Sequence, residues 1–183
     1  FFLYFAMNIP HANNEAGGDV RAGKNGMEVP DHGPFAQKEW PDQEKGFARM
    51  IEIIDSDVGR ILDRLDELGL AQNTLVLFSS DNGPHQEGGH KMNYFDSNGP
   101  LRGMKRDLYE GGIRVPLIVQ WPGHIRPGLE SDHISGFQDI LPTLAEIAGK
   151  GVADTDGISF VPTLLADGGQ QKKPPHRYWE FYE

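Results

Sequence analysis

The feature that most constrains the fold is a long amphipathic stretch, residues 41–68, followed after a short link by a buried strand. Apolar residues recur in steps of three and four between Phe47 and Leu68, the spacing of one face of an α-helix. The next apolar run, residues 74–80, is rich in β-branched and apolar side chains and predicts a buried strand. A helix that leads into a buried strand is the αβ step of a doubly wound sheet, so we expect α/β architecture with this helix covering the sheet.

Further regular elements are separated by long irregular segments. Apolar runs and periodicity predict strands at residues 1–6, 113–121 and 178–182 and a helix at residues 138–148. Pro116 has no backbone N–H to donate, so we expect the strand that contains it to lie at a sheet edge or to form a bulge. Residues 13–39 and 83–112 predict long loops, and loops of that length inside a compact domain are usually functional or disordered. Because both chain ends fall within strand-like runs, we expect a fragment that is cut at both ends.

The composition excludes several classes of protein. The formal net charge is −10, whereas a nucleic-acid binder needs a surplus of cations to neutralise phosphates. The chain has no cysteine, so disulfides, zinc thiolates and thiol nucleophiles are excluded within it. We find no apolar run of the ~20 residues that a membrane span requires. The sequence therefore predicts neither a nucleic-acid partner nor a membrane span.

One loop concentrates positive charge in this acidic chain. The cations of the cluster surround Asp107 and Glu110, and they are Arg102, Lys105, Arg106 and Arg114. Such a cluster either is a solvated loop of mixed charge or binds a small anion. Charge alone leaves both interpretations open.

Two candidate sites follow the ends of predicted strands. In doubly wound sheets, binding and catalytic residues lie beyond the carboxyl ends of the strands. Asp81 and Asn82 supply hard oxygen ligands of the kind that calcium and magnesium prefer, although two ligands do not complete a calcium site. The alternative is that the residues Asp-Asn-Gly-Pro simply form a turn. His11 follows the first strand and is a candidate proton donor, or an ordinary loop histidine.

Three further side chains are weaker candidates. Lys105 offers a point charge for an anion, and His85 and His90 lie five residues apart in a glycine-rich loop where they face either a metal or a polar ligand. No Ser-His-Asp order, P-loop or dinucleotide-binding fingerprint is present.

These positions together match a known pattern. Residues 68–85 end in Phe-Ser-Ser-Asp-Asn-Gly-Pro-His, and residues 105–116 read Lys-x-x-x-x-Glu-Gly-Gly-x-Arg-x-Pro, followed by Trp-Pro-Gly-His. The chain closely resembles the arylsulfatase A-like sulfatases of the alkaline phosphatase superfamily. Ile9-Pro10-His11, residues 138–144 and residues 156–160 fit that family in the same order. The resemblance implies that residues 1–183 are part of one catalytic domain, with an alkaline-phosphatase-like mixed sheet and flanking helices.

The resemblance also implies roles for individual residues. Asp81 and Asn82 match calcium ligands, Lys105 matches the lysine that holds a sulfate oxygen, and His11 matches the histidine near the bridging oxygen of the ester. Arg102, from the cationic cluster, is a further candidate for binding the substrate. The family's nucleophile is a formylglycine made in a Cys/Ser-x-Pro/Ala-Ser-Arg motif, and this motif is absent from the chain. We therefore expect the parent protein to hydrolyse sulfate esters and this chain alone to be inactive.

The loop of residues 85–90 resembles bacterial family members that act on sulfated sugars. This resemblance implies a saccharide sulfate ester as substrate, with His85 and His90 touching the sugar, and a periplasmic, secreted or lysosomal location. One rival is a phosphoesterase or phosphomutase with two transition metals, for which Asp31-His32-Gly33 is a weak signal. The other rival is a sugar-binding sulfatase homologue without activity, which the upstream nucleophile motif would distinguish.

Overall fold

The computed structural model describes residues 1–15, 26–152, 154–166 and 169–182. They form two compact units. The first comprises Phe1–Glu67, Ser79–Pro116 and Phe181–Glu183, and the second comprises Leu68–Phe78 and Leu117–Glu180. Over the described ranges, no helix has both the length and the apolar character needed to cross a membrane.

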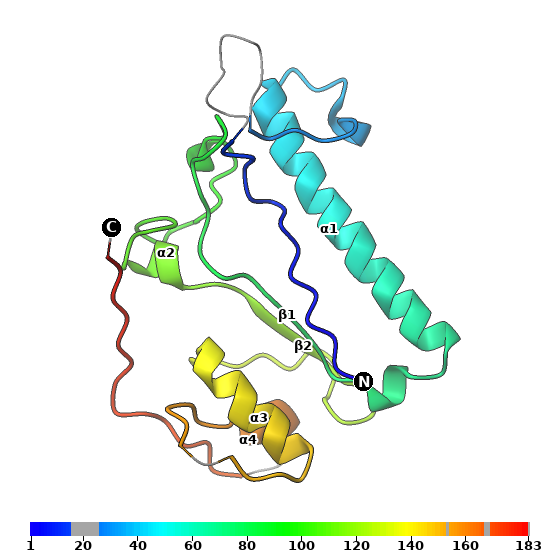
Figure 1. The fold of residues 1–183 in the computed structure, drawn as a ribbon, viewed down its shortest axis with the longest axis vertical. Coiled ribbons are helices and arrows are strands. Elements are labelled where there is room, and N and C mark those ends of the chain that lie inside the picture. Colours follow the sequence, from blue (N-terminus) through cyan, green and yellow to red (C-terminus); the bar gives the residue numbers. More distant parts are fainter. Residues whose placement is uncertain (16–25, 153, 167–168, 183) are drawn as a thin grey trace. The chain divides into compact units, whose positions relative to one another are not determined.

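Helix α1 (Asp42–Glu67) is the longest element of the first unit (Figure 1). The helix predicted at residues 41–68 is thus confirmed, and Asp42 and Glu44 lie in its first turn, where carboxylates favour the positive end of the helix dipole. Its buried residues, which include Met50 and Ile54, lie in the N-terminal half. The rest of the apolar stripe is half-buried or exposed, and Leu68 just beyond it is 52% exposed.

The core of the first unit forms where the loop before α1 folds onto that helix. Met50 packs against Ala12 and Met27, and Ile9, Val29 and Phe47 border this cluster. The approach is so close that a Cβ added to Gly46 of α1 would lie 2.0 Å from the Met27 carbonyl oxygen. Gly46 is therefore required for the loop to reach the helix.

Short helical turns replace part of the predicted irregular structure. The 3-10 helices η2 (Gly33–Phe35) and η4 (Met92–Tyr94) and the helix α2 (Glu110–Ile113) belong to the first unit. We predicted a strand from residue 113, but β2 begins at Leu117 and residue 113 closes α2. The turn forms because the Gly112 and Ile113 N–H groups both donate to the Tyr109 carbonyl oxygen, at 2.8 and 3.2 Å.

Strand β1 (Val76–Ser79) pairs with β2 (Leu117–Gln120) in a two-stranded sheet (Figure 1). Both lie inside runs predicted as strands, so these predictions are confirmed in shortened form, but β1 is half-buried along its length instead of buried. The strands predicted at residues 1–6 and 178–182 are wrong, because neither run pairs with a strand in the described chain. Phe1 is 87% exposed and Tyr182 is 79% exposed. An apolar run becomes a strand only when a neighbour accepts its backbone hydrogen bonds.

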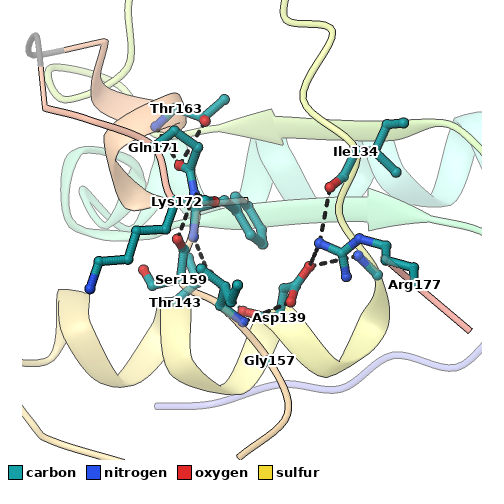
Figure 2. A network of polar contacts seen from close by, with 12 residues as sticks. Ile134, Asp139, Thr143, Gly157, Ser159, Thr163, Gln171, Lys172 and Arg177 are labelled. Atoms are coloured by element: carbon teal, nitrogen blue, oxygen red, sulfur yellow. Dashed lines mark hydrogen bonds and ion pairs between the residues drawn. The ribbon is translucent and has the colours of Figure 1, made fainter. Parts of the chain in front are cut away.

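The second unit contains η3 (Ala71–Asn73), η5 (Phe137–Asp139), α3 (Ile140–Ile147) and α4 (Val161–Leu165). The helix predicted at residues 138–148 is confirmed as η5 followed by α3. Asp139, which joins these two helices, is completely buried. Its carboxylate accepts hydrogen bonds from the N–H groups of Gly136 and Ile158, each at 2.8 Å, and pairs with Arg177 at 2.6 Å (Figure 2).

The contacts of Asp139 explain why it remains charged. Burial alone raises the pKa of its carboxyl, but the two N–H donors and Arg177 outweigh burial and hold this pKa below its usual value. Thr143 continues the network, since its hydroxyl donates to the Asp139 carbonyl oxygen at 2.6 Å and accepts from the Phe160 N–H at 3.1 Å. Gly157 is required nearby, because an added Cβ would lie 1.9 Å from the Gln138 carbonyl oxygen.

Two glycines of α1 provide a matched test of this packing. Gly46→Ala should lower the free energy of unfolding by about 2 kcal/mol or more, because its methyl group meets the Met27 carbonyl. Gly59→Ala in the same helix has no atom within 4 Å of the new Cβ and should raise stability by roughly 0.5–1 kcal/mol. Chemical denaturation of both variants measures the difference, and equal effects would contradict the proposed contact.

Candidate functional site

The turn after β1 is fixed by the backbone of α2. The Gly83 N–H donates to the Gly112 carbonyl oxygen at 2.9 Å. A Cβ at Gly83 would lie 1.9 Å from the Gly111 carbonyl oxygen, so this close approach requires glycine. The Ser80 hydroxyl also donates to the Asn82 carbonyl oxygen at 2.9 Å. Asp81 and Asn82 therefore project from a restrained turn.

These two side chains have oxygens that a hard cation can use. Asp81 is exposed, and its carboxylate has no hydrogen bond or ion pair with the rest of the described chain. Asn82 donates through Nδ2 to the Gly83 carbonyl oxygen at 2.8 Å, which leaves its Oδ1 available. The donor types fit calcium, but no cluster of three or more His, Cys, Asp or Glu side chains suited to a metal occurs among the described residues. The metal-binding role of Asp81 and Asn82 therefore stays a prediction.

The same turn is connected to the basic loop. The Lys105 N–H donates to the Pro84 carbonyl oxygen at 2.8 Å. Its side-chain Nζ lies 2.8 Å from His11 Nε2 and 2.8 Å from Glu87 Oε2, and the Lys105 side chain is only 16% exposed. The structure thus brings together His11 and Lys105, two predicted site residues that are 94 positions apart in the sequence.

The contacts of His11 determine its protonation pattern. A lysine ammonium only donates hydrogen bonds, so the Nε2 atom of His11 accepts from Lys105. The other ring nitrogen, Nδ1, lies 2.7 Å from the Ala12 carbonyl oxygen and donates to it. These two contacts place the Nδ1–H of His11 against the Ala12 carbonyl and direct its Nε2 lone pair at the Lys105 ammonium.

Glu87 joins this group, although we did not predict it from the sequence. Its carboxylate lies 2.8 Å from Lys105 Nζ, 3.2 Å from Arg106 Nη2 and 3.5 Å from His11 Nε2. Burial raises the pKa of Glu87, but the hydrogen bond and the charge of Lys105 lower it below its ordinary value, and His11 and His85 act in the same direction when they are protonated. A lone glutamate between two predicted histidines carried no signal that could have identified it.

His85 holds the Glu87 loop against the His11 segment. Its Nε2–H donates to the Pro10 carbonyl oxygen at 3.0 Å, and its Nδ1 accepts from the Glu87 N–H at 3.0 Å. The residue is buried, and this burial outweighs the hydrogen bond to Pro10 and holds its pKa below the ordinary histidine value. The sugar contact predicted for His85 stays a prediction, whereas its observed contacts support a positioning role.

His90 is buried beside His85 in the same loop, with their ring centroids 5.5 Å apart. Its Nδ1 lies 2.6 Å from Glu44 Oε2, and the Lys91 N–H donates to the other Glu44 oxygen at 3.0 Å. The imidazole stacks on Phe47 of α1, with ring centroids 3.8 Å apart. Its side chain has no exposed surface, so these contacts favour a packing role, and the predicted sugar contact is untested.

The other cations of the basic loop are engaged elsewhere. The guanidinium of Arg102 lies over the Tyr109 ring, 3.7 Å from its centroid. Arg114 pairs with Glu110 at 3.5 Å. Of the cluster identified in the sequence, Lys105 and Arg106 therefore gather around Glu87, while the anion-binding role predicted for Arg102 remains a prediction.

The chain is similar to known proteins over most of its length. A protein-family model described as Sulfatase matches residues 1–150. Arylsulfatase A of Homo sapiens is 34% identical over 184 residues, which cover 100% of this chain and 31% of that protein. Steryl-sulfatase of Rattus norvegicus is 41% identical over 138 residues, covering 72% of this chain and 24% of that protein.

A solved structure shares the fold. The crystal structure of Ps i-CgsB in complex with k-i-k-neocarrahexaose superimposes with a TM-score of 0.66 at 28% identity, covering 76% of this chain and 31% of that chain. The chain thus spans about a third or less of the length of each of these relatives.

The contact between Glu44 and His90 provides a stability test. Glu44→Ala removes the acceptor for a buried donor, the His90 ring, and for a part-buried donor, the Lys91 N–H, and should lower the free energy of unfolding by roughly 3 kcal/mol. The control is Glu52→Ala in the same helix, which removes a partly exposed pair with Arg49 and should cost less than about 1 kcal/mol. Denaturant titration compares them, and costs of similar size would show that the buried contact contributes little.

Proposed function

The chain belongs to the sulfatase family, and from that premise we propose that the protein hydrolyses sulfate esters with Lys105 and His11 acting at the sulfate group. The observation that supports this proposal is the 2.8 Å contact between Lys105 Nζ and His11 Nε2. It joins a cation to an imidazole at the meeting point of three segments, near the restrained turn that carries Asp81 and Asn82. A sulfuryl group needs such a combination, because negative charge builds on its oxygens and on the departing alkoxide.

Lys105 is proposed to bind a sulfate oxygen. Its ammonium has three N–H donors, of which one is directed at Glu87 and one at His11. Since both partners lie in the same small region, the ammonium can turn to a substrate oxygen without a change in the backbone, which the Pro84 contact restrains. The charge then stabilises the transition state electrostatically.

His11 is proposed to protonate the departing alkoxide. In the structure its Nε2 accepts a hydrogen bond, so it must first release Lys105 and take up a proton from solvent, to which its side chain is 51% exposed, before it can act as an acid. Transfer of the Lys105 hydrogen bonds to the sulfate group would free Nε2 for that step. Glu87, 3.5 Å away, would then face the protonated ring and interact favourably with its charge.

Asp81 and Asn82 are proposed to hold calcium through their carboxylate and amide oxygens. A bound calcium ion would polarise the sulfuryl oxygens as a Lewis acid. The family's formylglycine would supply the attacking hydroxyl, and its motif does not occur among these 183 residues. The residues of this chain therefore provide part of the metal site and part of the anion site.

A saccharide sulfate is the proposed substrate class. The support is the resemblance of the loop of residues 85–90 to bacterial carbohydrate sulfatases, together with the similarity to Ps i-CgsB, whose structure holds k-i-k-neocarrahexaose. The periplasmic, secreted or lysosomal location implied by the family stays a prediction.

The two-metal phosphoesterase is disfavoured by the contacts of Asp31, the first residue of the Asp-His-Gly segment. A two-metal phosphoesterase would use an Asp-His-Gly arrangement, but here the Asp31 carboxylate accepts the Gly33 N–H at 2.7 Å and lies 3.5 Å from Arg49. Asp31 thus stabilises a turn beside α1. The second rival, a sugar-binding homologue without activity, differs in turnover, which the following two experiments measure.

Lys105→Ala in the intact protein should lower kcat for an aryl sulfate by 10²-fold or more, on the order expected when one charge-stabilising donor is lost. Lys150→Ala, an exposed lysine after α3, is the control and should leave kcat unchanged. Asp81→Ala should separately weaken calcium binding in calorimetric titration. Wild-type kcat in the Lys105 variant would remove Lys105 from the site, and absence of any wild-type turnover would favour the non-catalytic rival.

The 183-residue chain by itself should show no turnover of an aryl sulfate, because it contains no formylglycine motif. Purified chain with calcium is assayed beside the intact protein. The same sample is checked for folding by circular dichroism. Turnover by the folded chain would show that the reaction does not need that nucleophile.

A further inference from the structure

We infer that Glu87 makes the anion site selective for singly charged sulfate esters over doubly charged anions, such as inorganic sulfate and phosphate monoesters. The inference rests on the proposed function, because it assumes that Lys105 binds the sulfate group. It goes beyond that function by assigning a specificity-determining role to a residue that the family resemblance left without one.

The position of Glu87 is built into the fold. Its N–H donates to His85 Nδ1 at 3.0 Å, and His85 in turn donates to the Pro10 carbonyl oxygen. The next residue, Gly88, has a positive φ of 63°, and an added Cβ would lie 2.8 Å from the Ala12 side chain. The carboxylate is thus held beside Lys105 by two neighbouring segments, and only 16% of its side chain is exposed.

Glu87 places one negative charge beside the cations that would hold the anion. Its carboxylate lies 2.8 Å from Lys105 Nζ and 3.2 Å from Arg106 Nη2, so an anion bound to Lys105 lies close to it. The repulsion between this carboxylate and a bound anion is twice as large for a dianion as for a sulfate monoester, because Coulomb energy is proportional to the charge of the ligand. Solvent screens this repulsion less than at an exposed site, since the Glu87 side chain is only 16% exposed.

The charge state of Glu87 supports this interpretation. The carboxylate is ionised at neutral pH because its pKa lies below the ordinary glutamate value, despite partial burial. It therefore repels an incoming anion throughout the neutral range. The consequence would be easier release of inorganic sulfate, the doubly charged product, and weaker binding of phosphate monoesters, which are doubly charged near neutral pH.

Two probes of similar shape and different charge test the inference on the intact protein. Methyl sulfate carries one negative charge and inorganic sulfate carries two. Because Coulomb energy is proportional to the charge of the ligand, Glu87→Gln should increase sulfate affinity by the square of the factor found for methyl sulfate. We expect roughly threefold for methyl sulfate and about tenfold for sulfate.

The control variants distinguish the effect of the Glu87 charge from the effects of its side-chain shape and of the net charge of the protein. Glu87→Asp keeps the carboxylate and should keep the wild-type ratio of the two affinities. Glu67→Gln changes the net charge equally at an exposed pair with Arg64 and should leave both affinities unchanged. If Glu87→Gln does not fold by circular dichroism, Glu87→Ala is measured with the same expected ratio.

The outcomes distinguish this inference from the proposed function. A ratio that does not change in Glu87→Gln, or weaker binding of both anions, would overturn the selectivity role and leave sulfate hydrolysis unaffected. A changed ratio in a protein that binds both anions but hydrolyses no sulfate ester would support the role of Glu87 and contradict the catalytic proposal. Calorimetric titration at constant ionic strength provides both affinities.

Discussion

The candidate site depends on how the Lys105 ammonium is held. Its backbone N–H is bonded to Pro84, and its side chain is directed at Glu87 and His11. Each partner has a consequence. The bond to Nε2 fixes the tautomer of His11, and the pair with Glu87 neutralises part of the positive charge that would otherwise attract any anion. A single cation shared by an imidazole and a carboxylate thus determines both the protonation pattern and the charge of the site.

Two buried carboxylates organise the units around fixed donors. In the first unit, Glu44 of α1 accepts from the His90 ring and from the Lys91 N–H, which holds the glycine-rich loop against the helix. In the second unit, Asp139 accepts from two backbone N–H groups and from Arg177 (Figure 2). A buried charge is tolerated only when its lone pairs are satisfied in this way. The segments at residues 138–144 and 156–160, which resemble the family, therefore have a structural role. They supply Asp139, Thr143 and Gly157 to this network.

Sequence periodicity predicted the long elements well and the short ones poorly. Helix α1 was identified because its apolar spacing continues for many turns, and α3 because its shorter pattern ends at a glycine. The runs at residues 1–6 and 178–182 have apolar or alternating sequences but no strand partner in the described chain, and strand formation depends on that partner. The turn of α2 was missed because Gly111 and Gly112 are poor helix formers. They are needed there for close backbone contacts.

By itself, the sequence determined the mixed helix and strand character, the positions of Asp81 and Asn82 after a strand, and the identity of His11 and Lys105 as candidates. These conclusions need only local patterns and motif order. Only the tertiary structure decided which charges meet, because contacts across 94 residues depend on how loops fold back on α1 and α2. It brought Glu87 to Lys105, turned Arg102 to Tyr109, and buried His90 against Glu44. Side chains of the same type in one loop thus acquired different environments, and the environment decides what each can do.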